Sequence, residues 1–589
     1  MAHIPTLSLK ESLLFDVFCA LVVHKIYNKY EVEPANLIAT FLLLAGVPAL
    51  PYYLLVPCME STVVAVLLAY ALFYVSLAVS VILYRISPMH PLAMYPGPLY
   101  LKISKLFWMY HASTGKQYVL FTRLHDKYGF VVRIGPNELS IVDVESIPPI
   151  IGLRKGPLPT HSALVWIAHG IPGTIPSLPA ARDVDVHDQR RKLWNHGFTT
   201  SALKELQPAV ENRVLELVDE LGKRTFPKSG GREISLDLAL WMSNFAMDRY
   251  DVMGDMVLSG GFSLVRKGDE GGTRALLGDF VECDSFPLHG EAYRLTYKDL
   301  RVVGVLQHTP WIIGLIHKLA AVPEGMRKFQ EFAFQRYKMR RSQGTATRDL
   351  FHYITNEEGL EKIEVPTDQG MNDVLTAIGA GADTTSTVLA AVFFYLLSNP
   401  SVCMRLRKEV ESEFPVEERE PFDAVKLARM PYLNAVMQYP PLSNEALRLQ
   451  PPVATSLQRC PLEGSGGVIV AGRLVPESTI LYLPPYLHHR DERYFSPSPD
   501  SFIPERWLDL DNKKFTTNVA AFIPFSAGRA NCVGKSLALM EIRMVVATIV
   551  QRFDMEFAEG YDPHKWEEDL QEFFVMKVGK LPVVLRARH

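Results

Sequence analysis

The stretch FIPFSAGRANCVGKSLALMEIRMVVATIV, residues 522–550, places a cysteine between glycines and next to a predicted helix. Phe525 stands seven residues before Cys532, and Gly528 and Gly534 flank the cysteine at four residues before and two after. A thiol at a helix start has a lowered pKa, because the dipole and free N–H groups favour the thiolate. Glycines let backbone approach a flat ligand, and a nearby aromatic ring shields the sulfur from water. The pattern predicts a soft, anionic iron ligand, the alternative being a buried structural cysteine.

The rest of the body has mostly helical patterns. A helix starting around Cys532 would bury Leu537, Met540, Met544 and Val545 on its apolar face. Residues 372–398 are apolar nearly all round, which predicts a long, central, buried helix, and residues 187–206 predict another. Strand patterns occur at 128–143 around a Gly-Pro turn, near 453–483, and at 574–586. The expected class is mainly α with small β-sheets.

Length and charge point to one large domain that does not bind nucleic acid. The chain has 589 residues, a net charge of −3, and no internal repeat. Its pI is about 6.6, and a nucleic-acid-binding domain would be strongly basic. The cysteines are scattered, without a CxxC pair, which argues against a disulfide framework or a zinc site and favours a reducing compartment. They are Cys19, Cys58, Cys283, Cys403, Cys460 and Cys532.

The first hundred residues differ in composition from the body. Residues 35–57 and 61–84 are almost wholly apolar, and each exceeds the roughly 20 residues that cross a bilayer core. The loop between them contains no Lys or Arg, whereas Lys25 and Lys29 precede the first span and Arg85 follows the second. The positive-inside rule therefore places both outer flanks on the cytosolic side.

An earlier apolar stretch, residues 12–24, is short and broken by Asp16, so it either lies in the membrane interface or forms a third, imperfect span. No small-residue cleavage site follows, which favours an anchor over a removed signal peptide. Residues 87–98 contain four prolines and predict a stiff connector. The expected organisation is a membrane anchor at 1–86, a linker at 87–98 and a catalytic domain at 99–589.

Three shorter motifs accompany the cysteine. AGADTT (380–385) lies on the long predicted helix, and FIPERW (502–507) lies before the cysteine stretch. Glu445 and Arg448 are three residues apart, so they share one face of a predicted helix. Taken singly, each motif has an ordinary explanation, and an exposed pair at this spacing stabilises a helix by only about 0.2–0.5 kcal/mol.

Together and in this order, the motifs resemble those of the cytochrome P450 superfamily, over about residues 95–589. The cysteine stretch is similar to the family's haem-binding pattern Phe-x-x-Gly-x-Arg-x-Cys-x-Gly, which implies that Cys532 is the axial thiolate ligand of the haem iron. One position departs from the pattern: Ala530 stands where the arginine is expected, and Arg529 lies one step earlier. The anchor and the segment NCVGKSLALMEIRMVV look like fungal microsomal members, particularly those of mushroom-forming basidiomycetes.

The resemblance also implies a set of haem contacts and a structural brace. The haem contacts would be Phe525, Gly528, Arg529, Gly534, His187, Arg191 and Arg459. For the last three, the alternative is a solvated surface cation. Glu445, Arg448 and Arg506 would form a buried network that supports the haem side of the core, since Arg and carboxylate groups pair in a bidentate manner.

On the long helix, the resemblance implies that Thr384 and Asp383 are catalytic. The Thr384 hydroxyl can bond back to the Ala380 carbonyl and distort the helix, and Gly381 removes side-chain bulk there. The resulting groove would admit O₂ and water. Thr384 would hydrogen-bond the reacting oxygen, and Asp383 would relay protons.

The implied function is a membrane-bound haem-thiolate monooxygenase that oxidises a lipophilic small molecule with O₂. Electrons would come from NADPH through a separate reductase, since no flavin region follows the haem loop. The endoplasmic reticulum membrane is the expected location, with the catalytic domain in the cytosol. The apolar segments 451–458 and 573–579 predict an apolar pocket, which fits terpenoids in fungal secondary metabolism and also fits fatty acids, aromatics or xenobiotics.

Two functions of other kinds stay open. A haem isomerase or dehydratase acting on a peroxide would need no Asp/Thr relay, so GADTT argues against it. A non-catalytic haem-binding membrane protein would not consume NADPH during turnover.

Residues 438–443, QYPPLS, look like an insertion beside the Glu445 helix. In one interpretation they form a loop, in which Pro440 and Pro441 end one helix and Ser443 caps the next. In the other they are a gene-model artefact, since such residues can be encoded by a pyrimidine-rich run ending in AG at an intron's end. The artefact is favoured, because a brace tolerates little slack beside it.

Overall fold

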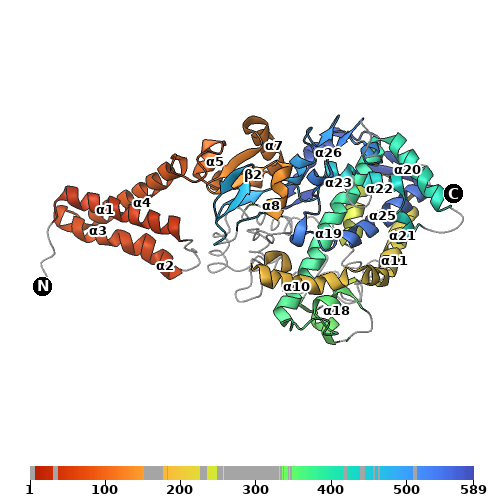
Figure 1. The fold of residues 1–589 in the computed structure, drawn as a ribbon, viewed down its shortest axis with the longest axis horizontal. Coiled ribbons are helices and arrows are strands. Elements are labelled where there is room, and N and C mark those ends of the chain that lie inside the picture. Colours follow the sequence, from red (N-terminus) through yellow and green to blue (C-terminus); the bar gives the residue numbers. More distant parts are fainter. Residues whose placement is uncertain are drawn as a thin grey trace.

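In the computed structural model, a helical arm at the N-terminus precedes a larger, mainly helical body with small β-sheets (Figure 1). The predicted fold class is thereby confirmed. The structure describes residues 7–30, 37–151, 177–181, 183–225, 235–247, 348–415, 421–437, 445–455, 458–461, 464–508 and 514–588, with short pieces between 256 and 344. The predicted insertion at 438–443 lies outside the described residues.

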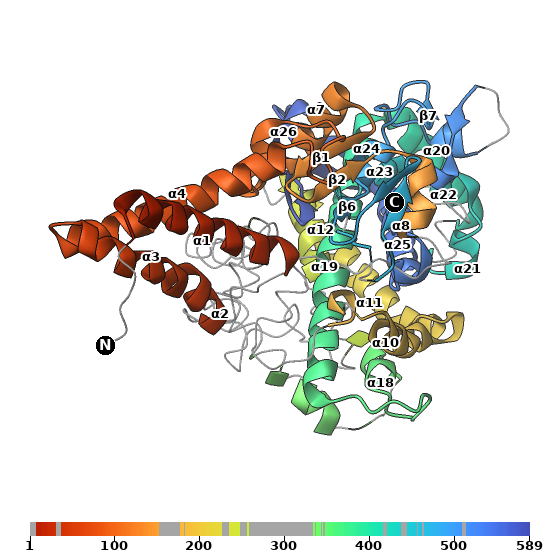
Figure 2. The ribbon, with the colours of Figure 1, turned by 60° about the vertical axis from the view of Figure 1, so that its left-hand side comes forward.

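The arm comprises α1 (Leu9–Lys29), α2 (Leu37–Phe41), a π-helical turn (Leu42–Gly46), α3 (Val47–Leu55), a 3₁₀ turn (Val56–Cys58) and α4 (Thr62–Ile86). Two segments of the arm, Ile38–Cys58 and Thr62–Ile86, are long and apolar enough to cross a membrane, in agreement with the two predicted spans. A third such segment, Thr367–Ser398, belongs to the body and is mostly buried there. The arm stays outside the body in both ribbon views (Figure 2). Arg85 fixes its end to the body by donating a 2.5 Å hydrogen bond to the Ile103 carbonyl of α5 (Leu99–Ile103).

Small sheets lie on the body, and the largest have three strands. One joins β1 (Val131–Gly135), β2 (Glu138–Ile141) and β6 (Ile480–Tyr482), with β2 antiparallel to β1 and parallel to β6. The other joins β3 (Ser235–Asp237), β12 (Pro582–Ala587) and β9 (Phe553–Phe557), all antiparallel. Two-stranded sheets join β4 (Val468–Val470) to β5 (Arg473–Val475), β7 (Phe495–Ser496) to β8 (Thr516–Thr517), and β10 (Gln571–Phe573) to β11 (Val575–Lys577).

The core forms around two long helices, α19 (Thr367–Ser398) and α25 (Lys535–Arg552), which pack on each other. The long buried helix predicted at 372–398 is confirmed, and its apolar residues join the main hydrophobic cluster of the body. The helices around this pair are α6 (Leu106–Ser113), α7 (Gln117–Tyr128), α8 (Ile147–Ile151), α10 (Val184–Gly197), α11 (Thr200–Thr225), α12 (Leu238–Met247), α18 (Leu350–Ile354), α20 (Pro400–Glu413), α21 (Ala424–Leu427), α22 (Pro431–Met437), α23 (Glu445–Leu449), α24 (Pro485–His488) and α26 (His564–Asp569).

Two helix predictions need correction. The single helix expected over 187–206 is wrong, because α10 ends at Gly197 and α11 begins at Thr200. The Thr199 hydroxyl accepts a hydrogen bond from the Ala202 N–H, which starts the second helix. The helix expected around Cys532 begins three residues later, at Lys535, so the cysteine lies in the preceding loop.

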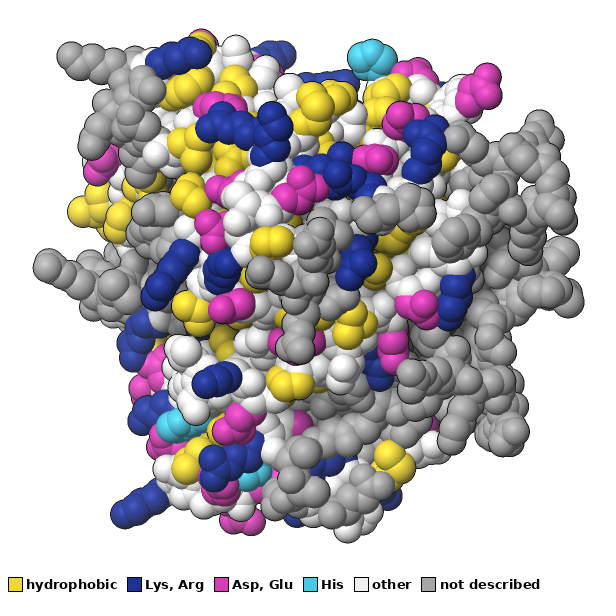
Figure 3. Space-filling model, turned by 90° about the vertical axis from the view of Figure 1, so that its right-hand side faces the viewer, with side chains coloured by type: hydrophobic (Ala, Val, Ile, Leu, Met, Phe, Trp, Pro, Cys, Tyr) yellow, Lys and Arg dark blue, Asp and Glu magenta, His cyan; other side chains and the backbone are white. Residues whose placement is uncertain are grey.

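The body surface remote from the arm is that of a water-facing protein. Figure 3 shows Lys and Arg side chains interspersed with Asp and Glu, with hydrophobic side chains scattered among them. Such a mixed surface contrasts with the arm, where α4 exposes Val64, Leu67, Val75 and Leu83.

A buried ion pair joins α10 to α19. The Arg190 guanidinium lies 2.6 Å from the Asp373 carboxylate, and the Leu178 N–H donates to the same oxygen at 3.0 Å. Both side chains are buried. Burial raises the pKa of Asp373 above its usual value, although the neighbouring Arg190 acts in the opposite direction. Each charge therefore depends on its partner to stay ionised inside the core.

We expect Arg190→Met to destabilise the body by about 3–5 kcal/mol, because it leaves a buried carboxylate without its cation. Thermal unfolding of the purified chain should show a clear drop in midpoint, and the double change Arg190→Met/Asp373→Leu should recover most of it. The control is Arg348→Met, which breaks an exposed pair with Glu358 and should change stability by less than about 1 kcal/mol. Equal effects of the two single variants would contradict this assignment.

Candidate active site

The loop before α25 presents Cys532 in a fixed turn. The Cys532 N–H donates to the Phe525 carbonyl at 2.9 Å, and the Asn531 N–H donates to the Gly528 carbonyl at 3.2 Å. Gly528 has φ +69°, a left-handed conformation in which a side chain is strained. The cysteine itself is exposed. This bond places the Phe525 backbone beside an exposed Cys532, and the shielding of the sulfur by the Phe525 ring stays a prediction.

The expected lowering of the thiol pKa is wrong for the protein alone. Although Cys532 is exposed at the surface of its loop, the protein atoms around the thiol displace enough water that desolvation raises the pKa of Cys532. The Gly534 N–H, the Arg191 guanidinium and the Lys535 ammonium all act to lower the pKa, but they do not outweigh burial. A metal cation at the sulfur would reverse this balance, since coordination deprotonates a thiol.

Helix α10 contributes two of the predicted haem contacts beside this loop. Arg191 donates through Nη1 to the Asn531 carbonyl at 2.6 Å and through Nη2 to the Asn531 side chain at 2.8 Å. His187 is buried one turn earlier, and burial lowers its pKa. Arg529, the arginine displaced by one step, pairs with Asp188 of the same helix. The structure therefore places Arg529 against α10.

Arg459 is the clearest candidate to bind an anion. Its side chain is only 3% exposed, and its backbone pairs with Leu481 of β6. Within the described part of the chain, its guanidinium has no hydrogen bond or ion pair, and burial lowers its pKa to about 10. A buried cation without a counterion requires an anion to offset its desolvation. A haem propionate would supply one, so the chemistry of Arg459, Arg191 and Cys532 fits a haem.

Thr384 and Asp383 lie on α19. The Thr384 hydroxyl donates to the Ala380 carbonyl at 2.8 Å, which is the predicted bond to the preceding turn. The segment nevertheless stays α-helical from Thr367 to Ser398, so this bond does not interrupt the helix. Thr387, one turn further on, donates to the Met576 carbonyl at 2.8 Å and so ties α19 to β11.

The two expected pocket segments are joined by a carboxyl group that sequence reasoning missed. The Met576 N–H donates to the Pro452 carbonyl at 2.7 Å. Glu572 accepts from the Thr455 N–H at 3.0 Å and from its hydroxyl at 2.7 Å. Burial raises the pKa of Glu572 to about 7, although its bonds to Thr455 act to lower it. In the sequence, the only indication of this contact is that Glu572 stands directly before the apolar segment 573–579.

Glu445 is the centre of the brace. Its carboxylate accepts two hydrogen bonds from Arg448, at 2.8 Å each, and one from Arg506 at 3.0 Å. The Trp507 indole donates to it at 2.8 Å, and the Ile503 N–H donates at 2.9 Å. Burial acts to raise the pKa of Glu445, but the paired guanidinium groups hold it below its usual value. The structure thus brings Glu445, Arg448 and Arg506 together as one buried network.

The brace is connected to the cysteine loop through one histidine. His489 is buried, and its Nδ1 lies 3.2 Å from the Arg448 carbonyl. Its Nε2 accepts from the Ile523 N–H at 2.9 Å. The proton therefore sits on Nδ1, and burial holds the pKa of His489 well below its usual value. Through this neutral imidazole, α23 positions the start of the loop that presents Cys532.

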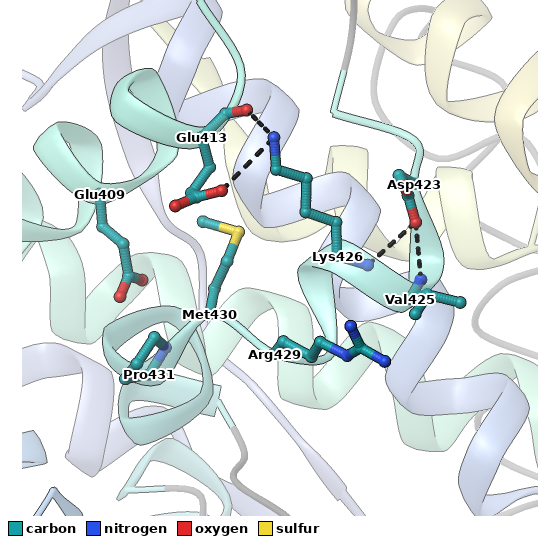
Figure 4. A pocket seen from close by; sticks show the side chains of 8 residues that line it. All are labelled: Glu409, Glu413, Asp423, Val425, Lys426, Arg429, Met430 and Pro431. Atoms are coloured by element: carbon teal, nitrogen blue, oxygen red, sulfur yellow. Dashed lines mark hydrogen bonds and ion pairs between the residues drawn. The ribbon is translucent and has the colours of Figure 1, made fainter.

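A hollow of about 380 Å³ lies at α20 and α21, apart from these residues (Figure 4). Two of its charged side chains have local partners. Glu409 accepts from the Tyr432 and Leu433 N–H groups at 2.7 and 2.6 Å, and Lys426 pairs with Glu413. None of the predicted site residues lines this hollow.

Comparison with known proteins shows the same family throughout. The sequence matches the family model described as Cytochrome P450 over residues 96–581. Cytochrome P450 67 of Uromyces fabae is 32% identical over 520 residues, covering 85% of this chain and 87% of the relative. Tryprostatin B 6-hydroxylase of Aspergillus fumigatus is 29% identical over 573 residues, covering 96% of this chain and 93% of the relative. Cytochrome P450 monooxygenase FCK2 of Fusarium pseudograminearum is 29% identical, covering 87% and 85%.

We expect Cys532→Ala to lose the thiolate-type Soret band of the reduced, CO-bound protein, or to lose haem altogether, because no other described thiol lies in this loop. The measurement is an absorbance difference spectrum of the purified chain. Cys403→Ala, which removes a half-buried thiol elsewhere, should keep the band. An unchanged spectrum in Cys532→Ala would rule out this ligand.

Glu572 should make stability depend on pH. Its pKa of about 7 in the folded chain lies above the ordinary 4.5, so its contribution is fully present below pH 4.5 and is lost as pH rises through 7. Between pH 5 and 8 the unmodified chain should lose about 3 kcal/mol more than Glu572→Gln. Thermal unfolding across this range measures the difference. Glu567→Gln, at an exposed carboxyl nearby, should follow the unmodified chain; parallel profiles for all three would contradict the assignment.

Proposed function

Because this chain belongs to the cytochrome P450 family of monooxygenases, we propose that it is a membrane-anchored haem-thiolate enzyme that oxidises a lipophilic small molecule in fungal secondary metabolism. The observation that carries this proposal is the accessible Cys532 with Arg191 beside it, together with the buried Arg459; within the described residues neither arginine pairs with a carboxylate. The tryprostatin B hydroxylase among its relatives supports a role in hydroxylation.

The residues divide into those that would hold haem and those that would serve the substrate side. Cys532 would be the iron ligand, with Phe525, Gly528 and Gly534 shaping its loop. Arg459, Arg191 and His187 would face the propionates. Arg529 would support this side indirectly, because its guanidinium already pairs with Asp188. Bound haem supplies the redox chemistry: RH + O₂ + NADPH + H⁺ gives ROH + NADP⁺ + H₂O.

On the opposite side, Thr384 and Asp383 would manage protons. The Thr384 hydroxyl donates to the Ala380 carbonyl at 2.8 Å. A hydroxyl held in this way can accept a hydrogen bond through its lone pairs, and rotation of its O–H away from Ala380 would let it donate that proton while it accepts another. Asp383 is half-buried and adjacent on the helix, which suits a carboxyl that exchanges protons with water.

Membrane location and electron supply complete the proposal. Residues 1–86 would anchor the chain in the endoplasmic reticulum membrane, residues 87–98 would link, and residues 99–589 would form the catalytic domain in the cytosol. The apolar arm and the mixed-charge surface of the body support this division (Figure 3). A separate NADPH-dependent reductase would deliver electrons.

The apolar segments 451–458 and 573–579 support a lipophilic substrate, and a terpenoid is the class we propose. Fatty acids and aromatic compounds are the alternatives. Yeast expressing the chain with a reductase, followed by untargeted metabolite profiling, tests this choice. A new oxygenated terpenoid that requires intact Cys532 is the expected result. Products made without NADPH would instead indicate an isomerase or dehydratase, and an absence of NADPH consumption with every substrate class would indicate a binding protein.

Thr384→Ala should keep haem and substrate binding but release reducing equivalents as peroxide. The fraction of NADPH that ends in product should fall roughly tenfold or more, because proton delivery is impaired. Coupling is measured as product and peroxide per NADPH. Thr376→Ala is the matched control, since Thr376 makes the same kind of bond to Asn372, 2.7 Å long, two turns earlier on α19. Wild-type coupling in Thr384→Ala would overturn its catalytic role.

A further inference from the structure

Helix α1 exposes apolar side chains and buries two polar ones, unlike a surface helix of a water-soluble protein. Between residues 12 and 24, its exposed side chains are apolar. Leu14 is 59% exposed, Phe18 60%, Leu21 47% and Val22 41%. The side that packs inside the arm contains Ser12 and Asp16, both fully buried, with Cys19, Ala20 and Val23. Such an arrangement is unfavourable in water and favourable in lipid.

Helix α1 runs beside the two predicted spans along its whole length. Near its start, the Cys58 thiol donates to the Leu7 carbonyl at 3.4 Å, and the Ser12 hydroxyl donates to the Leu54 carbonyl at 3.3 Å. Near its end, His24 lies 2.6 Å from the Ser80 hydroxyl of α4. Helix α1 is therefore antiparallel to α3 and parallel to α4, at the same level as both. Figures 1 and 2 show the three helices side by side.

The interface between these helices has the composition of a membrane bundle. Ala20 of α1 is fully buried, as are Ala65 and Ala69 of α4. Small side chains allow helices to approach closely where no hydrophobic effect drives them together. The Asp16 carboxyl also faces this interior, and within the described arm it has no hydrogen-bond partner. Ionisable groups in membrane proteins are placed in the bundle interior rather than toward lipid.

Length and charge also fit a helix that crosses the bilayer. Helix α1 has 21 residues and so spans roughly 30 Å, the thickness of the hydrocarbon core. Its exposed charges stand only at its ends: Lys10 and Glu11 at the start, Lys25 and Lys29 at the close. Lys25 and Lys29 lie at the same end of the arm as Arg85, which gives this end the positive excess of a cytosolic face.

An orientation flat on the membrane surface does not account for these contacts. An interfacial helix keeps its polar side in water and its apolar side in lipid. In α1, the buried Ser12 and Asp16 are covered by neighbouring helices, so no polar side remains for water between residues 12 and 24.

We propose that α1 is a third membrane-spanning helix, with its Leu14/Phe18/Leu21/Val22 face against lipid acyl chains and the N-terminus on the lumenal side. The inference rests on the proposed membrane anchoring of α3 and α4. It resolves the two possibilities that the sequence left open for residues 12–24, and it moves the N-terminus to the side of the membrane opposite the body.

Two cysteine substitutions on α1 test this topology in the full-length chain. In sealed yeast microsomes, a membrane-impermeant maleimide should modify Asn28→Cys but not Lys10→Cys, with the unsubstituted chain giving the background. Detergent permeabilisation should then expose Lys10→Cys. Modification of both positions in sealed microsomes, or protection of both, would overturn the three-helix topology.

Glycosylation provides a second measurement that does not depend on thiol reactivity. An Asn-Gly-Thr acceptor on a hydrophilic N-terminal extension should gain an endoglycosidase-sensitive glycan, and the same extension at the C-terminus should not. An unmodified N-terminal acceptor would count against the proposal. Carbonate extraction separates the two levels of inference: release of the chain refutes membrane anchoring itself, whereas retention with a cytosolic N-terminus refutes only the third span.

Discussion

The Glu445 carboxylate is the interaction on which the active-site side of the body depends. It is fully buried and accepts hydrogen bonds from Arg448, Arg506, Trp507 and Ile503. A charge in such a place is tolerable only while its partners stay in position. Arg448 in turn holds the His489 carbonyl at 2.7 Å, and the His489 ring holds the loop that leads to the cysteine. Loss of the central charge would therefore leave Arg448 and Arg506 without their common partner and loosen the support of the cysteine loop.

Helix α10 links α19 to the cysteine loop through three charged side chains. Arg190 reaches into the core and pairs with Asp373 of α19, Arg191 holds Asn531 beside the cysteine, and Asp188 pairs with Arg529. One helix thus fixes the distance between the proposed proton-relay helix and the ligand loop. A movement of α10 would therefore shift both α19 and the cysteine loop.

The sequence was most informative where a residue type has one chemical use. The buried helix and the Glu445/Arg448 pair followed from periodicity and spacing and are present in the structure, and the family that the motifs resemble is the one the comparison shows. It was less informative where burial decides the outcome. The Cys532 pKa is raised because surrounding atoms outweigh local dipoles, and the importance of Arg190 and Glu572 depends on contacts between segments far apart in the chain. The break after Gly197 reflects a local capping bond that periodicity does not reveal.

The same distinction explains why α1 was ambiguous. A hydropathy sum over residues 12–24 counts Asp16 and the flanking charges against a membrane span. Such a sum treats every side chain as if it faced lipid. In the structure Asp16 faces inward and the terminal charges stand at the two ends, so the surface between them is apolar. Whether a helix suits lipid depends on its exposed side chains rather than on its total residue content, and the packing of the helices determines which side chains are exposed. The arm and the body thus differ at their surfaces rather than in their interiors: both bury some polar groups, but the arm exposes apolar side chains where the body exposes charged ones.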